Sequence, residues 1–491
     1  MRLDELTAGL APEAGGDVEI TGLAYDSRAV SGGELFFCVS GFQRDGHEFA
    51  QQALQAGAAA LLVERRLSLS VPEVLVPSAR AALAPIAARF YGDPTARLRV
   101  VGVTGTNGKT TTAYLVRALL EAVGEQCGLL GTVSSIVGGQ QRAVTRTTPE
   151  AIDLQAVFAE MLDGGDGACA IEVSSHALEL GRADATHFAV AIFTNLTQDH
   201  LDFHDTMEDY FLAKRRLFTE HQPLHSVINV ADPYGVRLAA EIDGAVTFAA
   251  QAPGGEPIAA DYVAENLRFD FAGTSFRLST AAGERELRLP LPGRFNVANA
   301  LAALAAAHAL GAELEPLLEA LQRGVRVPGR FEPVEEGQDF AVLVDYAHTP
   351  DSLQSVLEAA RALVDAGRVL CVFGAGGDRD RGKRPLMGEI AARLADVTFV
   401  TSDNPRSEDP EQIIAEIMAG VARVPEQPLV RSVADRAIAI DEAIGAAQAG
   451  DVLVIAGKGH EQGQELAGGR KVPFDDVTVA RKALRVLRGR A

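Results

Sequence analysis

One segment of this 491-residue chain combines a glycine-containing loop with groups that bind phosphate. Residues 103–124 read VTGTNGKTTTAYLVRALLEAVG, which predicts the end of a strand, a loop and then a helix. Backbone N–H groups at such a helix start surround phosphate oxygens, Lys109 adds positive charge, and the Thr110 hydroxyl can reach a magnesium ion. The spacing departs from GxxxxGK[ST], because Val103 stands where the first glycine is expected. We predict a phosphate-binding loop; a glycine turn beside a solvated lysine is the alternative.

Strands and helices alternate along most of the chain and must position this loop. Short apolar, β-branched runs end in Gly-rich turns and are followed by Ala- and Leu-rich stretches, the alternation typical of parallel α/β sheets. Polar residues or glycines gather at the C-terminal end of each run, the edge where open α/β sheets bind ligands. The clearest runs are RVVGVTG, ACAIEVSS, AVAIFTN, FAVLVDYAH, RVLCVFGAGG, DVTFVTSDNP and DVLVIAGKGH.

Length and loop composition predict three domains. At roughly 150 residues per domain, 491 residues correspond to about three. Gly- and Pro-containing loops near residues 95–99 and 325–335 mark two boundaries. The predicted domains are residues 1–97, 98–330 and 331–491.

Composition narrows the class of protein. The chain is 47% hydrophobic and 23% charged, with a mean hydropathy of +0.08, so it should fold throughout. A net charge of −21 argues against a broad nucleic-acid-binding face. The N-terminus lacks a signal-peptide pattern, and no apolar stretch is long enough to cross a membrane, so a cytoplasmic protein is expected. Four widely spaced cysteines predict buried, reduced thiols.

A series of motifs accompanies the loop in a specific order. TTPE, EVSSHAL and TNLTQDHLDFH follow it, and further along the chain come YFLAKRRLF, PGRFNVANALAA, PGRFE, DYAHTPDSL, GGDRDRGKRPLMG, DNPR and GKGHE. DSRAVSGGELFFCVSG precedes it. Together these motifs resemble the Mur ligases over about residues 20–465. The resemblance implies an α/β fold of three domains: an N-terminal UDP-binding domain, a central P-loop ATPase domain with a parallel sheet, and a C-terminal Rossmann-like domain that binds an amino acid.

The resemblance implies ATP-dependent formation of an amide bond in two steps. A carboxylate first attacks the γ-phosphate of ATP to give an acyl phosphate, and an amine then displaces phosphate. The first step brings two anions together, so cations must stabilise the transition state. Lys109 and Mg²⁺ are the expected cations. The expected catalytic residues are Lys109, Glu172, His200 and Lys214.

The resemblance also assigns the ATP and metal sites. Thr110, Glu172, His200 and Lys214 are implied for metal, with Lys214 converted by CO₂ into a carbamate. Without the motifs, Glu172 could cap a helix, His200 could be a buried core residue, and Lys214 could be a solvated lysine on an amphipathic helix. The residues implied for ATP are Gly105, Thr106, Asn107, Gly108, Lys109, Thr110, Thr111, Asn296, Arg330, Asp345 and His348; the last four have loop capping as their alternative role.

The resemblance implies that the acceptor of the phosphate is a UDP-linked muramoyl dipeptide. This substrate is UDP-N-acetylmuramoyl-L-alanyl-D-glutamate. Hydroxyls and one guanidinium suit its sugar oxygens, amides and carboxylates. Leu180 departs from the family pattern, in which glutamine is common. The residues implied for this substrate are Ser27, Thr147, Thr148, Ser174 and Arg182; a turn followed by a strand is the alternative for the Ser27 segment.

DNPR carries the residue expected to select the incoming amino acid. Meso-2,6-diaminopimelate carries one carboxylate more than lysine, and Arg406 offers bidentate geometry for it. Asp403 and Glu461 suit ammonium groups. The implied pocket comprises Arg379, Asp403, Asn404, Pro405, Arg406, Gly457 and Glu461; a proline-containing turn that caps a helix is the alternative for DNPR.

A ligase that adds diaminopimelate is the activity that the motifs favour, and three other activities are its alternatives. A lysine-adding homologue should lack Arg406. A folylpolyglutamate-type ligase shares the loop and metal motifs but needs neither DSR nor DNPR. An ATP-driven binding or regulatory protein should have lost one of the four expected catalytic residues, and all four are present. We expect a monomer that binds neither nucleic acid nor membrane.

Overall fold

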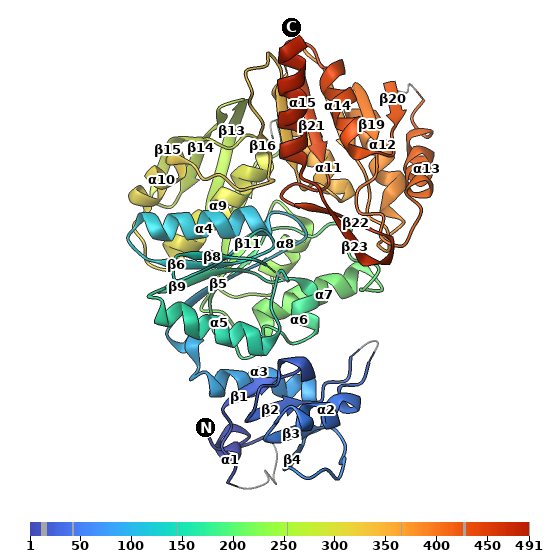
Figure 1. The fold of residues 1–491 in the computed structure, drawn as a ribbon. Coiled ribbons are helices and arrows are strands. Elements are labelled where there is room, and N and C mark those ends of the chain that lie inside the picture. The colour runs from blue at the N-terminus through green and yellow to red at the C-terminus, as the bar shows by residue number, and fades with distance from the viewer. Residues whose placement is uncertain are drawn as a thin grey trace. The chain divides into compact units, whose positions relative to one another are not determined.

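The computed structural model describes residues 1–10, 17–41, 44–144, 146–252, 254–364, 366–425 and 429–490 (Figure 1). Contacts within the chain define two compact units. The first unit comprises Met1–Thr104, Gly124–Ala191 and Ala213–Leu224. The second unit comprises Gly105–Val123, Ile192–Leu212 and His225–Ala491.

The first unit begins with a small parallel sheet, in which the strands follow the order β1-β2-β3-β4. One apolar cluster joins β2 and β3 to α1 and α3, and a second joins them to α2. The elements are α1 (Leu3–Leu6), β1 (Gly22–Ala24), β2 (Glu34–Phe37), α2 (Ala50–Gln55), β3 (Ala60–Val63), β4 (Glu73–Leu75) and α3 (Ala79–Phe90).

A second group of strands in the first unit contains the strand that leads into the phosphate-binding loop. β5 and β6 both pair with β9 in parallel, whereas β7 pairs antiparallel with β6 and β8. The elements are β5 (Arg99–Thr104), β6 (Cys127–Leu130), β7 (Ser135–Val137), β8 (Gln140–Arg142), α5 (Ala151–Asp163), β9 (Ala168–Glu172) and α6 (Ser175–Glu179). β10 (Phe188–Phe193) and α7 (Met207–Thr219) each contribute residues to both units.

In the second unit, α4 (Lys109–Ala122) packs against α9 (Arg294–Ala309), which lies on β11, β12 and β13. The pairing is parallel from β11 to β13 and antiparallel from β13 to β15. These antiparallel strands are missing from the sequence analysis. The remaining elements here are β11 (His225–Asn229), α8 (Pro233–Ala239), β12 (Val246–Ala250), β13 (Tyr262–Asp270), β14 (Gly273–Thr280), β15 (Gly283–Leu289) and α10 (Leu314–Arg323).

The end of the chain forms a three-layer α/β sandwich within the second unit (Figure 1). Its strands follow the order β16-β17-β21-β18-β19-β20, parallel except for β16. One face packs on α11, α12 and α13, and the other on α14 and α15.

The bounds of these elements are β16 (Glu332–Pro333), β17 (Ala341–Asp345), α11 (Pro350–Ala362), β18 (Val369–Phe373), α12 (Lys383–Leu394), β19 (Val397–Val400), α13 (Pro410–Val421), β20 (Leu429–Ser432), α14 (Arg436–Ala446), β21 (Val452–Ala456) and α15 (Asp476–Arg490). A hairpin of β22 (Gly463–Leu466) and β23 (Arg470–Pro473) lies between β21 and α15 in the sequence.

The structure confirms that all seven apolar runs are strands and that four of them, β17, β18, β19 and β21, lie parallel in one sheet. Their C-terminal ends therefore share one edge, as predicted. The four cysteines are buried and free, also as predicted. The helix predicted after the loop is present and ends at Ala122, and its C-cap Val123 is exposed. The three-domain division stays a prediction.

Within the described ranges, none of the helices is long and apolar enough to span a bilayer.

A buried ion pair joins the last helix to the sheet layer. Arg436, at the start of α14, donates from Nε and Nη2 to Asp476 of α15, at 2.7 Å each. Nη2 also donates to the carbonyl of Ala456 at the end of β21, at 2.9 Å. Both side chains are fully buried. Removal of one partner leaves an uncompensated buried charge, which costs far more than the intact pair contributes.

We predict that Asp476→Asn lowers the free energy of unfolding by about 3 to 5 kcal/mol, because Arg436 loses its counter-charge in the core. Urea denaturation followed by circular dichroism measures this change. Asp441→Asn, at an exposed acid on the same α14, is the matched control and should shift the curve by less than about 0.5 kcal/mol. Equal, small effects of the two substitutions would contradict the role of the pair.

Candidate functional site

The phosphate-binding loop depends on two glycines. Gly105 and Gly108 have φ angles of +146° and +86°, which residues with a Cβ rarely adopt. A Cβ on Gly105 would lie 1.9 Å from Oγ1 of Thr194, and one on Gly108 would lie 2.3 Å from Oδ1 of Asn299. Gly108 is the N-cap of α4, so the loop turns directly into the helix. The glycines therefore allow both the turn and the close packing around it.

Lys109 folds back over this loop. Its Nζ donates to the carbonyl oxygens of Gly105, at 2.8 Å, and Thr106, at 2.7 Å. The ammonium group is thus held at the loop, where an anion would meet backbone N–H groups and positive charge together. The alternative of a solvated lysine is wrong.

The segment Thr194–Thr197 braces the loop from the side. Asn195 accepts from the N–H of Thr106 with its carbonyl and from the N–H of Asn107 with its side chain, at 2.9 Å each. Thr194 donates from Oγ1 to the carbonyl of Asn107 at 2.7 Å. Thr197 donates its N–H to Oγ1 of Thr106 at 3.0 Å. The TNLT motif therefore fixes the backbone of the loop, a role that the sequence analysis did not assign to it.

Residues from the C-terminal sandwich reach the same loop. Nη2 of Arg330 donates to Oγ1 of Thr110 at 2.9 Å, while its guanidinium lies 4.5 Å from the ring centre of Tyr346. Nδ2 of Asn107 donates to Asp351 at 2.8 Å. Asp351, which begins α11, is a site residue that the sequence analysis missed, although it lies in the DYAHTPDSL motif. The loop is therefore contacted by polar groups of the segment that follows α10.

Asp345 and His348 have structural partners close by. Asp345 is buried and accepts from the N–H groups of Phe331, at 2.7 Å, and Ala347, at 2.8 Å. Burial raises the pKa of its carboxyl above the ordinary value, although Arg330 opposes the shift. Nδ1 of His348 lies 2.7 Å from the carbonyl of Tyr346. Burial, with Lys383 nearby, lowers the pKa of His348, which favours the neutral ring at pH 7.

Asp199 is a buried carboxylate among positive groups. Burial alone would raise its pKa, but His200, His348 and Lys383 outweigh that effect and lower it to about 2. Nε2 of His200 lies 3.4 Å from Oδ2 of Asp199. The His200 side chain is only partly buried, and its φ is +56°, so the alternative of a core histidine is wrong. Asp199 was missed in the sequence analysis, although it directly precedes His200.

Asn296 and Asn299 lie one turn apart on α9. Nδ2 of Asn296 donates to the carbonyl of Pro292 at 2.8 Å, and the residue is buried. Asn299 instead faces the loop, since its Oδ1 lies against Gly108 and accepts from Oγ1 of Thr112 at 3.3 Å. The motif GRFNVANA places both asparagines on one helical face, and this spacing could have identified Asn299.

In the first unit, Glu172 ends β9 as an oriented, buried carboxylate. Oε1 accepts from the N–H of Thr132 at 2.8 Å, and Oε2 accepts from its hydroxyl at 3.1 Å. The cap of α6 is Ser174, which accepts from Ala177, so the helix-capping alternative for Glu172 is wrong. A carboxylate held in this way suits a hard cation such as Mg²⁺.

Lys214 of α7 is 1% exposed. The alternative of a solvated lysine is therefore wrong, since a lysine this deeply buried requires a partner or the loss of its charge. The described residues contain no cluster of three His, Cys, Asp or Glu side chains that could hold a metal by themselves. Mg²⁺ commonly takes one or two protein oxygens and completes its shell with phosphates and water. The Thr110 hydroxyl in the second unit and the Glu172 carboxylate in the first each suit such a partial ligand set by themselves.

Residues predicted for the sugar dipeptide surround the end of β9. Oγ1 of Thr148 donates to the carbonyl of Glu172 at 2.8 Å and lies 3.5 Å from Oγ of Ser174. Oγ1 of Thr147 lies 3.1 Å from Oγ1 of Thr132. Arg182 pairs with Glu150 at 2.9 Å. Further toward the N-terminus, Ser27 donates to Gln52 at 3.1 Å.

The second unit brings DNPR and GKGHE together. Asn404 donates to Oε2 of Glu461 at 2.9 Å, and Nζ of Lys458 donates to both, at 2.9 Å to Asn404 and 2.8 Å to Glu461. Nζ of Lys458 also lies 3.9 Å from Asp403. A Cβ on Gly457 would lie 2.5 Å from Oδ2 of Asp403. These residues come from the loops after β19 and β21, at the predicted edge.

Lys458 is the residue of this pocket that the sequence analysis missed. Its side chain is fully buried, and it connects an amide and two carboxylates. Its place inside GKGHE was the available signal, but its burial was not visible in the sequence.

Arg406 lies beside these groups. It donates from Nη1 to the carbonyl of Gly377 at 2.7 Å and from Nε to Glu465 at 3.1 Å. Its φ of +51° is unusual for arginine and marks a constrained turn. Pro405 directly precedes Arg406. Nη1 of Arg379 donates to the carbonyl of Asp378 at 2.9 Å. The guanidinium is thus positioned by its neighbours. The N-cap of the following helix α13 is Asp409, so the alternative that DNPR caps this helix is wrong.

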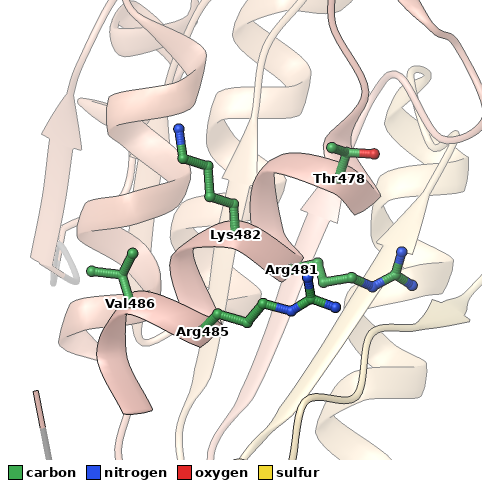
Figure 2. Close-up of a pocket in the computed structure, with 5 residues that line it drawn as sticks. All are labelled: Thr478, Arg481, Lys482, Arg485 and Val486. Atoms are coloured by element: carbon green, nitrogen blue, oxygen red, sulfur yellow. The ribbon is translucent and has the colours of Figure 1, made fainter. Parts of the chain in front are cut away.

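A hollow of about 530 Å³ lies elsewhere, along α15. Figure 2 shows that Lys482 and the two arginines extend from one helix around it. Arg481 and Arg485 both pair with Glu336, at 3.1 and 2.9 Å, which neutralises part of their charge. None of the predicted site residues lines this hollow. Its lining is Thr478, Arg481, Lys482, Arg485 and Val486.

Three family descriptions match the chain. The Mur ligase middle domain matches residues 103–307, and the Mur ligase glutamate ligase domain matches residues 329–459. The Mur ligase family catalytic domain matches residues 19–91. The loop, the motifs around Glu172 and His200, and the C-terminal pocket as far as Lys458 thus fall in matched segments, whereas Glu461 lies just beyond them.

Individual relatives are similar over the whole chain. The UDP-N-acetylmuramoyl-L-alanyl-D-glutamate--2,6-diaminopimelate ligase of Geobacillus kaustophilus (strain HTA426) is 48% identical over 482 residues, which cover 96% of each chain. A solved structure of a ligase with the same name is 33% identical, with a TM-score of 0.70 and 99% of both chains covered. The MurF ligase from Thermotoga maritima in complex with ADP shares the fold at 19% identity, with a TM-score of 0.68 and coverage of 97% and 100%.

We predict that Gly105→Ala abolishes detectable nucleotide binding, because the new Cβ would collide with Thr194 and the φ angle would be strained. Titration with a fluorescent ATP analogue measures the affinity. Gly445→Ala is the control, since that glycine lies in open space at an ordinary φ. Unchanged affinity in Gly105→Ala would show that the close approach to Thr194 is dispensable.

Proposed function

The chain belongs to the Mur ligase family, and from this premise we propose how it carries out its reaction. It is an ATP-dependent ligase that adds 2,6-diaminopimelate to UDP-N-acetylmuramoyl-L-alanyl-D-glutamate during synthesis of the peptidoglycan precursor. We propose that it takes the meso form and that the reaction passes through an acyl phosphate. We also propose a cytoplasmic protein that acts as a monomer, since each proposed ligand-binding residue belongs to this one chain.

The observation that carries the proposal is the grouping of Asp403, Asn404, Lys458 and Glu461 beside Arg406. Carboxylates suit the ammonium groups of diaminopimelate, and a guanidinium suits its distal carboxylate. Lysine has no carboxylate at that end, so it would make no charge-assisted bond to Arg406, whose anionic partner in the structure is Glu465. The pocket therefore favours diaminopimelate over lysine.

For the first step, we propose that Lys109 and the N–H groups of the loop hold the phosphates of ATP. The braced loop keeps these donors in place before substrate arrives, which limits reorganisation during the reaction. Arg330 contacts Thr110 and adds a second positive charge near the loop. A bound Mg²⁺, for which the Thr110 hydroxyl is suitable, would neutralise phosphate charge. Glu172 and His200 are each candidates for binding a second Mg²⁺.

For Lys214, we propose carbamylation by CO₂. The reaction joins the neutral ε-amine to the carbon of CO₂ and releases one proton, so that an anionic carbamate replaces a cation. The burial of Lys214 supports this assignment, because an ordinary charged lysine is almost always exposed to solvent. The carbamate oxygens would then be available to a metal ion.

A folylpolyglutamate-type ligase is the weaker alternative. A folylpolyglutamate synthase structure shares the fold at 20% identity and covers 84% of this chain, whereas the diaminopimelate ligases match nearly all of it. A folylpolyglutamate-type ligase would need neither the DSR segment nor the DNPR segment. The fold alone does not distinguish the two activities.

We predict that the purified protein releases phosphate with ATP, Mg²⁺, UDP-N-acetylmuramoyl-L-alanyl-D-glutamate and meso-diaminopimelate. Replacement of diaminopimelate by L-lysine should reduce kcat/KM by at least about 100-fold, because the charge-assisted bond to Arg406 is lost. Equal turnover of the two amino acids would contradict the pocket assignment. Turnover with a folate substrate and glutamate alone would support the alternative.

We further predict that Arg406→Ala raises the KM for diaminopimelate by about 10- to 100-fold and leaves the KM for ATP within about twofold. Lys458→Met should also raise the KM for diaminopimelate, because Glu461 and Asn404 lose the cation that orients them. The exposed Arg393 is the control for Arg406, as Arg393→Ala. A rise in the KM for ATP instead would contradict this division of roles.

A further inference from the structure

Arg384 is a fully buried cation that joins two loops of the second unit. It is the second residue of α12. Nη1 and Nη2 donate to the two carboxylate oxygens of Glu408, at 2.9 and 2.7 Å. Nη1 also donates to Glu416 of α13 at 2.8 Å, and Nη2 donates to the carbonyl of Gly376 at 3.1 Å. The guanidinium therefore connects the loop after β18 with the loop after β19.

Arg384 and Glu408 form a rigid, ionised pair, which we call the loop pair. The hydrogen bonds from Arg384 lower the pKa of the Glu408 carboxyl to about 2, although burial acts in the opposite direction. A bidentate bond between a guanidinium and a carboxylate fixes the relative orientation of the two groups. Because a buried charge without a partner is costly, this arrangement is strongly favoured over any that separates the two side chains.

The loop pair holds the residues on both sides of Gly377. Arg384 binds the carbonyl of Gly376, and Glu408 accepts from the N–H of Asp378 at 2.6 Å. The carbonyl of Gly377, between these two contacts, accepts from Nη1 of Arg406 at 2.7 Å. The backbone group that holds the Arg406 guanidinium is thus itself fixed by its two neighbours in the chain.

The turn that carries Arg406 also ends at the loop pair. The N–H of Glu408 donates to the carbonyl of Pro405 at 3.0 Å, and Arg406 lies between them with a φ of +51°. A Cβ on Gly377 would lie 1.9 Å from the same carbonyl oxygen of Pro405, so the two loops are in close contact. A displacement of Glu408 would therefore move the backbone of Arg406 as well as the carbonyl that its side chain binds.

The direction of the Arg406 guanidinium matters for the ligand proposed above. Nη1 bonds to Gly377 and Nε to Glu465, which together fix the plane of the group. Bidentate recognition of a carboxylate requires that this plane and the carboxylate be aligned. A binding group keeps such an alignment only where the residues behind it are themselves held in place.

We propose that Arg384 and Glu408 are positioning residues that aim Arg406 at the distal carboxylate of diaminopimelate. They act through Arg406 and the two loops, and they set the preference for diaminopimelate over lysine indirectly. The inference rests on the proposed function, which assigns that carboxylate to Arg406. It extends the pocket to a buried arginine of the GGDRDRGKRPLMG motif and to the glutamate two residues beyond DNPR.

A purely structural role is the alternative, in which Arg384 only fastens α12 to α13. The chain offers a direct comparison, because Glu408 and Glu416 both pair with Arg384. Glu408 lies in the loop of Arg406, whereas Glu416 lies within α13. Arg384→Ala would not separate the two roles, since it leaves both carboxylates without their buried counter-charge and can unfold the protein.

The Glu408→Gln variant tests the proposal, because it keeps the side-chain volume and leaves Glu416 as a counter-charge for Arg384. We expect the KM for diaminopimelate to rise by about 5- to 20-fold, while kcat and the KM for ATP change by less than about twofold. The preference for diaminopimelate over L-lysine should fall by a similar factor, because lysine does not use Arg406. Phosphate release at saturating UDP-N-acetylmuramoyl-L-alanyl-D-glutamate measures these constants.

A double-mutant cycle with Arg406→Ala shows whether Glu408 acts through Arg406. Once Arg406 is replaced by alanine, there is no guanidinium left to aim. In that background Glu408→Gln should therefore change the KM for diaminopimelate by less than about twofold. A structural role would give the same fold-change in both backgrounds.

Glu416→Gln is the matched comparison, since it removes the same charge from the other partner of Arg384. It should leave the KM for diaminopimelate within about twofold, because it lies outside the loop of Arg406. Thermal unfolding followed by circular dichroism compares the stability of the two variants. The exposed Glu411, as Glu411→Gln, controls for the loss of a negative charge near the start of α13.

Unchanged KM for diaminopimelate in Glu408→Gln would overturn the proposal. Equal rises in KM in Glu408→Gln and Glu416→Gln, or equal rises with and without Arg406, would overturn it in favour of the structural role. Failure of the proposed pocket is distinguishable, because it appears as an unchanged KM for diaminopimelate in Arg406→Ala alone, and that result would contradict both the pocket and its positioning residues.

Discussion

The hydrogen bonds between the phosphate-binding loop and the segment Thr194–Thr197 are the constraint on which the rest of the site depends. The loop turns through two glycines with positive φ, a conformation with little stability of its own. Asn195 holds it by satisfying two consecutive N–H groups. Other N–H groups and Lys109 then remain oriented toward an incoming phosphate. A preformed set of donors is what phosphoryl transfer requires, because most of the catalysis consists of positioning and charge stabilisation.

Buried charge recurs in the segments that we propose to recognise ionic ligands. Lys458 joins Asn404 and Glu461, and Lys214 is buried within α7. Desolvated charges are expensive, so each set is organised by hydrogen bonds and counter-charges before any ligand binds. The same expense gives selectivity, because a ligand of the wrong charge would leave one of these groups unpaired. Arg436 and Asp476 differ, since they pair only with protein groups and support the fold.

Much of the architecture followed from local patterns. The seven apolar runs are strands because β-branched residues between Gly-rich turns suit parallel sheets buried on both faces. The antiparallel strands β14 and β15 were missed because polar and apolar residues alternate along them. This alternation is a weaker signal than a continuous apolar run. The helix predicted after the loop is α4, which ends at Ala122, and Gly124, with a φ of +87°, follows its C-cap Val123.

The sequence by itself determined the order of the motifs, the α/β class, the family and the chemistry of the reactive side chains, since these depend on residue types and short spacings. Tertiary structure alone decided which polar groups are buried and which distant residues meet. Asn195 braces a loop about 90 residues before it, Asn299 meets Gly108, and Arg80 joins Arg182 at Glu150. Such contacts depend on how strands and helices pack over long sequence separations, and no local pattern encodes that packing.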